Sequence, residues 1–162
     1  MKRLNSSAGR LRRIELVVLS VGVLIAVISL FWDSQGAFQA NVGGSTGAER
    51  LVIILLTIFA FLVVGLVIIA PYVLLFIVGK LIAGDGKANI YQVAGLVIST
   101  LVTFTSIFLY IDAHQTVSQD SSSTAGLVFL AIPIVLCTAG GIPYFILTLL
   151  YSRAQKQDDA KP

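Results

Sequence analysis

Four long segments of this chain have no charged residue in their cores, at about 14–32, 51–79, 90–111 and 125–151. Each is close to or longer than the roughly 20 residues that a helix needs to cross a hydrocarbon core about 30 Å thick. A helix that is apolar on every side is not suited to a water-soluble surface. The segments therefore predict an all-α membrane protein, built as a bundle of four transmembrane helices.

The composition supports a single membrane domain. The chain is 57% hydrophobic and 12% charged, with a mean hydropathy of +0.95, whereas about a quarter of a soluble domain is charged. We expect a basic cytoplasmic tail at 1–13, the membrane domain at 14–151 and a second cytoplasmic tail at 152–162. This leaves little chain for a soluble domain.

The basic residues predict the orientation. Ten of the eleven lysines and arginines precede the first segment, separate the second from the third, or follow the fourth, and only Arg50 falls on the other side. The positive-inside rule then places both termini in the cytoplasm. We expect a multi-pass protein of the plasma membrane, in particular of a bacterial inner membrane. The net charge of +3 reflects this topology and does not indicate a nucleic-acid partner.

Glu15 lies at the cytoplasmic end of the first segment, beside Arg12 and Arg13. A glutamate in that position can reach toward water or pair with an arginine. We interpret it as an edge residue, with a buried functional carboxylate as the alternative. Small multidrug-resistance transporters also have four helices and a glutamate in the first, but theirs lies within the membrane and their loops are shorter. That comparison is therefore set aside.

The second and fourth segments carry helix-bending residues. The second would form a helix of about 43 Å, longer than the hydrocarbon core, and Pro71 should bend it. The fourth contains Gly140 and Gly141 between Pro133 and Pro143. We expect a kinked helix with a close glycine contact that presents a surface to a partner. A broken helix that holds a ligand is the alternative.

The third segment carries a row of small and polar residues. Gly95, Ser99 and Thr103 are spaced by four, and Ser106 continues the row, so all four lie on one helix face. Such a face packs helices closely in lipid. We predict helix packing or partner binding, with the wall of a permeation path as the alternative.

The sequence offers little chemistry. His114 is the only histidine and Cys137 the only cysteine, and no catalytic set, metal-ligand cluster or phosphate-binding loop can be assembled from the spacing. We expect neither an enzyme nor a bound cofactor. The scarcity of ionisable groups inside the segments also argues against proton-coupled transport.

Residues 122–133 (SSTAGLVFLAIP) resemble a segment of small, uncharacterised inner-membrane proteins of bacteria. The four-helix plan is also similar to that of immunity proteins, which protect a membrane from a pore-forming toxin. We therefore expect a non-enzymatic protein that lies in the lipid bilayer and binds a membrane protein partner or a second copy of itself. The most concrete form of this expectation is an immunity or accessory protein. A small oligomeric channel or transporter is the alternative.

Overall fold

The computed structural model describes residues 7–43, 47–82, 89–119 and 127–159. These residues form the four helices α1 (Ser7–Gly43), α2 (Gly47–Ile82), α3 (Ile90–Gln119) and α4 (Leu127–Asp159), and no strand occurs within those ranges. Each helix contains a stretch that is long and apolar enough to cross a membrane. The prediction of an all-helical chain with four candidate membrane-spanning helices is confirmed.

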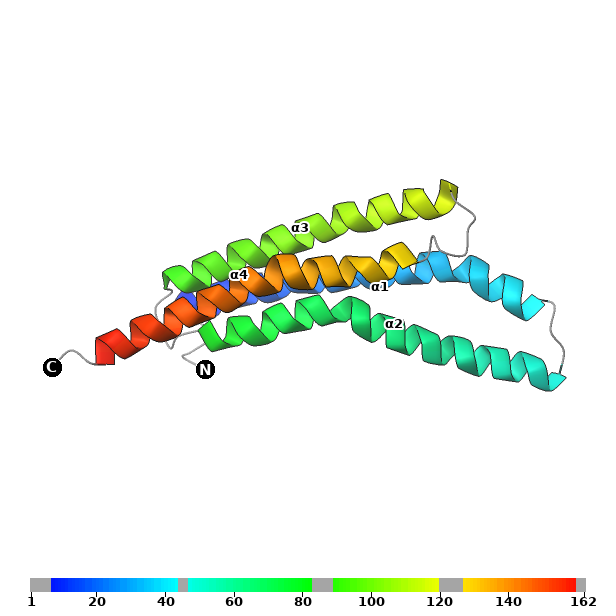
Figure 1. The fold of residues 1–162 in the computed structure, drawn as a ribbon, viewed down its shortest axis with the longest axis horizontal. Coiled ribbons are helices and arrows are strands. Elements are labelled where there is room, and N and C mark those ends of the chain that lie inside the picture. The colour runs from blue at the N-terminus through cyan, green and yellow to red at the C-terminus, as the bar shows by residue number, and fades with distance from the viewer. Residues whose placement is uncertain (1–6, 44–46, 83–88, 120–126, 160–162) are drawn as a thin grey trace.

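The helices run alternately up and down. In Figure 1, α1 begins and α4 ends at the same end of the molecule, where α2 also ends and α3 begins. We call this the basic end, because the basic residues of the described ranges, other than Arg50, lie on the helix turns that meet there. The outer end is the opposite one. Both α1 and α4 pack along α2 and α3, so α1 and α4 occupy opposite corners of the bundle.

The helices are longer than the apolar segments. Residues 33–50 and 112–124 lie between the predicted segments, but α1 continues to Gly43, α2 begins at Gly47 and α3 continues to Gln119. Hydropathy marks where a helix leaves an apolar environment, and polar residues such as those at 33–35 do not by themselves end a helix. The Gly- and Ser-rich stretches at 44–46 and 120–126 lie outside the described residues.

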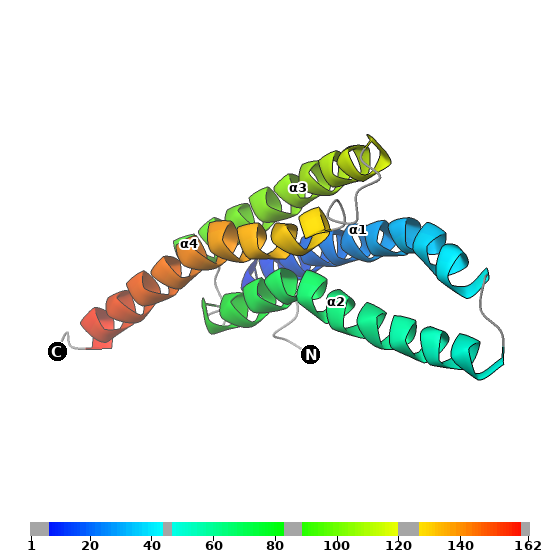
Figure 2. The same cartoon turned by 45° about the vertical axis from the view of Figure 1, so that its right-hand side comes forward.

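A bend divides α2 into two halves. The 36 residues of this helix would extend about 54 Å if straight, and Figures 1 and 2 show α2 changing direction part of the way along. Pro71 lies inside the helix and is buried. Proline has no backbone N–H and its ring crowds the preceding turn, which bends a helix. The α4 helix contains both Pro133 and Pro143 and continues through them.

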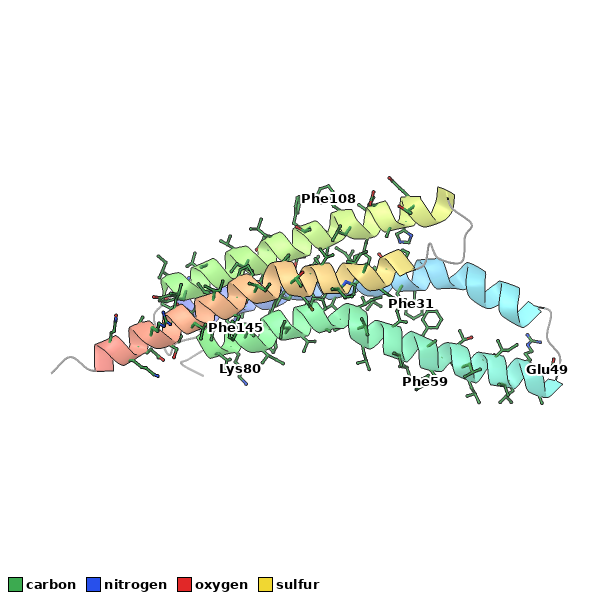
Figure 3. All side chains as sticks on the ribbon, in the orientation of Figure 1. Phe31, Glu49, Phe59, Lys80, Phe108 and Phe145 are labelled. Atoms are coloured by element: carbon green, nitrogen blue, oxygen red, sulfur yellow. The ribbon has the colours of Figure 1, made fainter. Side chains whose placement is uncertain are left out.

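The outer ends of α1 and α2 project beyond those of α3 and α4 (Figures 1 and 2). The surface of the described residues carries many exposed large apolar side chains. Phe59, Phe108 and Phe145, labelled in Figure 3, are 66%, 58% and 63% exposed.

Candidate functional site

A buried carboxylate lies where all four helices meet. Glu15 of α1 is only 6% exposed. One of its oxygens, Oε1, accepts a hydrogen bond from the Tyr144 hydroxyl of α4 and another, of 3.2 Å, from the Ser99 hydroxyl of α3. Because α1 and α4 occupy opposite corners, the contact between Glu15 and Tyr144 crosses the middle of the bundle.

Arg12 supplies the opposite charge and joins the second helix. Its Nη1 lies 2.6 Å from Oε2 of Glu15, and its Nη2 donates a hydrogen bond of 2.5 Å to the carbonyl oxygen of Phe76 in α2. The guanidinium also lies 4.5 Å from the centre of the Phe76 ring, a cation–π arrangement. The Arg12 side chain is 19% exposed and that of Glu15 is 8% exposed. The carboxylate is therefore the more deeply buried partner.

Two glycines make room for this arrangement. A Cβ added to Gly79 of α2 would lie 2.7 Å from Oε1 of Glu15, and one added to Gly95 of α3 would lie 2.7 Å from the Tyr144 hydroxyl. Distances this short are not tolerated between heavy atoms that are not hydrogen-bonded, so a larger residue would displace the polar groups. The following residues form what we call the polar centre: Arg12, Glu15, Gly79, Gly95, Ser99 and Tyr144.

The polar centre is tightly filled. A cavity of about 10 Å³ lies beside it, lined by Gln92 together with Leu11 and members of the polar centre. That volume is at the lower limit for a single water molecule. The Gln92 side chain also caps the start of α3, because its Oε1 accepts a hydrogen bond of 3.3 Å from the backbone N–H of Asn89. The cavity therefore has no room for a larger solute in this conformation.

The row on α3 faces the interior of the bundle. Gly95, Ser99, Thr103 and Ser106 are all buried. The Thr103 hydroxyl donates a hydrogen bond of 3.4 Å to the Val18 carbonyl of α1, and the Ser106 hydroxyl donates one of 2.6 Å to the Thr103 carbonyl. The bond from Thr103 joins α3 to α1, whereas the bond from Ser106 lies within α3. A role of the row in binding a partner stays a prediction.

The glycine pair on α4 also faces other helices. A Cβ on Gly140 would lie 2.6 Å from a methyl group of Val102 in α3, while one on Gly141 would lie 3.2 Å from a methyl group of Leu74 in α2. This stretch of α4 is therefore packed against α3 and α2, and it is not an open surface on the described chain. The expected partner-binding role of the two glycines stays a prediction as well.

Two further tyrosines are buried in the bundle. Tyr72 of α2 and Tyr110 of α3 are each 1% exposed, and their hydroxyls have no hydrogen-bond partner among the described residues. The ring of Tyr72 packs against Gly22 of α1, where a Cβ would lie 2.3 Å from the ring. These tyrosines extend the polar interior beyond the row on α3.

The position of Glu15 corrects the sequence analysis. The pairing with Arg12 is present, but the carboxylate points into the bundle and not toward water. One sequence signal indicates this: Glu15 falls in a series of buried α1 residues spaced alternately by four and three, which is the pattern of a helix-packing seam. The members that follow Glu15 in this series are Leu19, Gly22, Ala26 and Ser29.

The described residues contain no group of three or more His, Cys, Asp or Glu side chains that could hold a metal ion. His114 packs edge-on against Phe129, with ring centres 5.5 Å apart, and Cys137 is a partly buried free thiol. What the polar centre offers chemically is one buried carboxylate that is bound by an arginine and two hydroxyl groups.

No protein-family model, curated protein or solved structure matches this chain. The resemblance to immunity proteins therefore stays a hypothesis, and function must be argued from the geometry.

Proposed function

We propose that this chain is a non-enzymatic, multi-pass membrane protein that acts by binding another membrane protein through helix contacts. In this proposal the helices lie in a bacterial inner membrane, with both termini in the cytoplasm. The gathering of basic residues at one end of the bundle supports that orientation. An immunity or accessory protein is the most concrete form of the proposal.

The observation that carries this proposal is a packing face of α2 that is buried by the other helices near the basic end and continues outward where it is less buried. Near the basic end this face is fully buried: Ile68, Leu75 and Ile82 are at most 1% exposed. The same face continues outward with the 3–4 spacing of a packing seam, through Val64 and Phe61 to Thr57. These three outer residues are only partly buried, and the outer part of α2 bends away from α3 and α4 (Figure 2).

The uncovered face forms a groove with α1. We call it the outer groove, and its volume is about 420 Å³. Phe61 closes its α1 side, where its ring stacks on Phe31 with centres 6.2 Å apart. The groove is lined by Leu30, Ile53, Leu56, Thr57, Ala60, Phe61 and Val64.

The outer groove fits a helix from another protein. In lipid, helices associate by close packing, which small residues at the interface permit. Ala60 and Thr57 are such residues, and the Thr57 hydroxyl is already bonded to the Ile53 carbonyl at 2.7 Å. Near the basic end, α4 packs against α2. A partner helix in the outer groove would pack against the outer half of α2 in the same way.

Site-specific photocrosslinking in intact membranes tests this proposal. We expect a photoreactive residue at Thr57 to give one discrete protein adduct, and the same residue at Phe59, on the opposite side of α2, to give none. The adduct should weaken as unlabelled wild-type chain is added in excess. The captured protein is then co-reconstituted with the wild type and with Thr57→Phe, which should bind it more weakly.

Three results would decide against partner binding: equal adducts at both positions, only lipid adducts at Thr57, or equal binding of Thr57→Phe. An adduct of twice the 17.3 kDa chain mass would instead identify a second copy of this chain as the partner.

A transporter or channel is the second candidate, and the burial of Glu15 favours it. Ionisable residues inside a membrane bundle often mark ion or substrate pathways. The filled polar centre would then have to open during transport. Saturable ion flux through the wild-type protein in liposomes, lost in a folded Glu15→Gln variant, would support this candidate. Liposomes that show no flux above empty controls would favour partner binding.

A further inference from the structure

A second groove lies along the junction of α1 and α2 near the basic end. We call it the inner groove, and its volume is about 330 Å³. Its walls are mostly apolar. The lining residues are Leu16, Leu19, Ser20, Val23, Tyr72, Val73 and Phe76.

The inner and outer grooves lie on different faces of α2. The outer groove follows the packing seam through Thr57 and Val64, whereas Val73 and Phe76 point away from that seam and are exposed. The inner groove therefore opens toward whatever surrounds the bundle, and for helices in a bilayer that is the hydrocarbon of lipid.

Two basic residues, Arg13 and Lys80, lie at the basic end of this groove by helix register. On α1, Arg13 lies three residues before Leu16 and seven before Ser20. On α2, Lys80 lies four residues after Phe76. Residues with these spacings share a helix face. Both Arg13 and Lys80 are exposed, and Figure 3 shows Lys80 projecting outward near the end of α2.

The neighbouring Arg12 has a different function at the same end. Its guanidinium pairs with Glu15 and covers the ring of Phe76. The pair is neutral, so the net positive charge beside the groove comes from Arg13 and Lys80. The inner groove, apolar along its walls and cationic at one end, is complementary to a molecule that has a hydrocarbon chain and an anionic head.

We propose that the inner groove binds one anionic phospholipid. One acyl chain lies along Leu16, Val23 and Val73, and the phosphate lies between Arg13 and Lys80. Basic residues at a membrane surface attract anionic headgroups, and the apolar walls supply the contact that fixes the lipid in place. This proposal requires that the helices lie in a bilayer, but it does not require a partner protein in the outer groove.

Native mass spectrometry of the purified full chain, with phosphatidylglycerol and phosphatidylcholine as the probes, tests the charges. We expect the wild type to bind phosphatidylglycerol more tightly. The double variant Arg13→Gln/Lys80→Gln should lose about 30-fold in affinity for it. The control Arg10→Gln/Arg153→Gln removes the same charge from exposed positions at the same end and should lose less than about threefold. Equal losses in both variants, or a wild type without headgroup preference, would overturn the proposal.

The groove itself is tested by filling it. We expect Ser20→Phe to weaken phosphatidylglycerol binding, and Thr100→Phe to leave it unchanged, because Thr100 is an exposed hydroxyl residue on α3, away from the groove. Glycerol phosphate at millimolar concentration should not displace the lipid. Unchanged binding by Ser20→Phe, or displacement by the soluble phosphate, would show that no acyl chain occupies the groove.

Discussion

The ion pair in the polar centre should respond unequally to the loss of its two members. The Glu15 carboxylate is buried and its Oε1 accepts two hydrogen bonds from α3 and α4, whereas Arg12 is partly exposed and also bonds the Phe76 carbonyl. Replacing Arg12 by Met leaves a carboxylate without its counter-charge inside the bundle. Replacing Glu15 by Gln leaves an arginine that can turn toward water.

The magnitudes follow from this asymmetry. Removing one partner of a buried ion pair costs roughly 3–5 kcal/mol, so we expect Arg12→Met to lower the free energy of unfolding by about 3 kcal/mol. Glu15→Gln keeps an oxygen that can accept from Tyr144 and Ser99, and should cost about 1 kcal/mol. The double variant removes both charges together and should cost less than the sum of the two single changes.

Reversible unfolding in mixed micelles, followed by helical circular dichroism, measures all three values against the wild type. Thr100→Ala, at an exposed position on α3, is the control and should change stability by less than about 0.5 kcal/mol. The reasoning fails if Glu15→Gln costs as much as Arg12→Met. It also fails if the double variant equals the sum, because two groups in direct contact should not behave independently.

Three other measurements test separate parts of the structure. We expect Gly140→Ala to destabilise the bundle by about 2 kcal/mol, because its Cβ would lie 2.6 Å from a valine methyl group. Gly141→Ala should change stability by less than about 0.5 kcal/mol, because only a leucine methyl group at 3.2 Å must move. Equal effects of the two variants on unfolding in micelles would contradict the packing of α4. Gly95→Ala should cost about 2 kcal/mol by displacing the hydroxyl of the tyrosine that crosses the bundle, 2.7 Å from the added carbon, and a melting temperature like that of the wild type would count against the crossing. In a cysteine-free background, a membrane-impermeant thiol reagent added from outside should label Glu49→Cys and spare Lys156→Cys, and the reverse pattern would invert the proposed orientation.

The helices could be predicted from sequence more readily than their ends. Apolar runs mark the stretches that avoid water. The first three lie within α1, α2 and α3, and the fourth lies within α4 from Leu127 onward, residues 125 and 126 being outside the described residues. The continuation of α1 to Gly43 leaves no such mark, because hydrogen bonds within the helix do not depend on whether its side chains are apolar. The inward face of α3 could also be read directly, because the spacing of Gly95, Ser99 and Thr103 is a property of one helix.

The polar centre could be predicted only in part. The contact between Arg12 and Glu15 joins residues three apart on one helix, so their pairing could be predicted from the sequence. The burial of Glu15 depends on Tyr144, which lies 129 residues away along the chain, and on the close approach of Gly79. No periodicity within a single segment contains that information, because it arises from how four helices are placed around one another.

The crossing of the bundle by Tyr144 has a consequence for how the protein is made. The chain is synthesised from its N-terminus, so α1, α2 and α3 precede α4. Until α4 arrives, Glu15 has Arg12 and Ser99 as partners but lacks the phenol that reaches it from the opposite corner. The first three helices therefore form an incomplete assembly with an under-bonded carboxylate near its centre. The last helix completes the hydrogen bonds of the first, so a chain that ends before residue 144 lacks the bond that Tyr144 donates to Glu15.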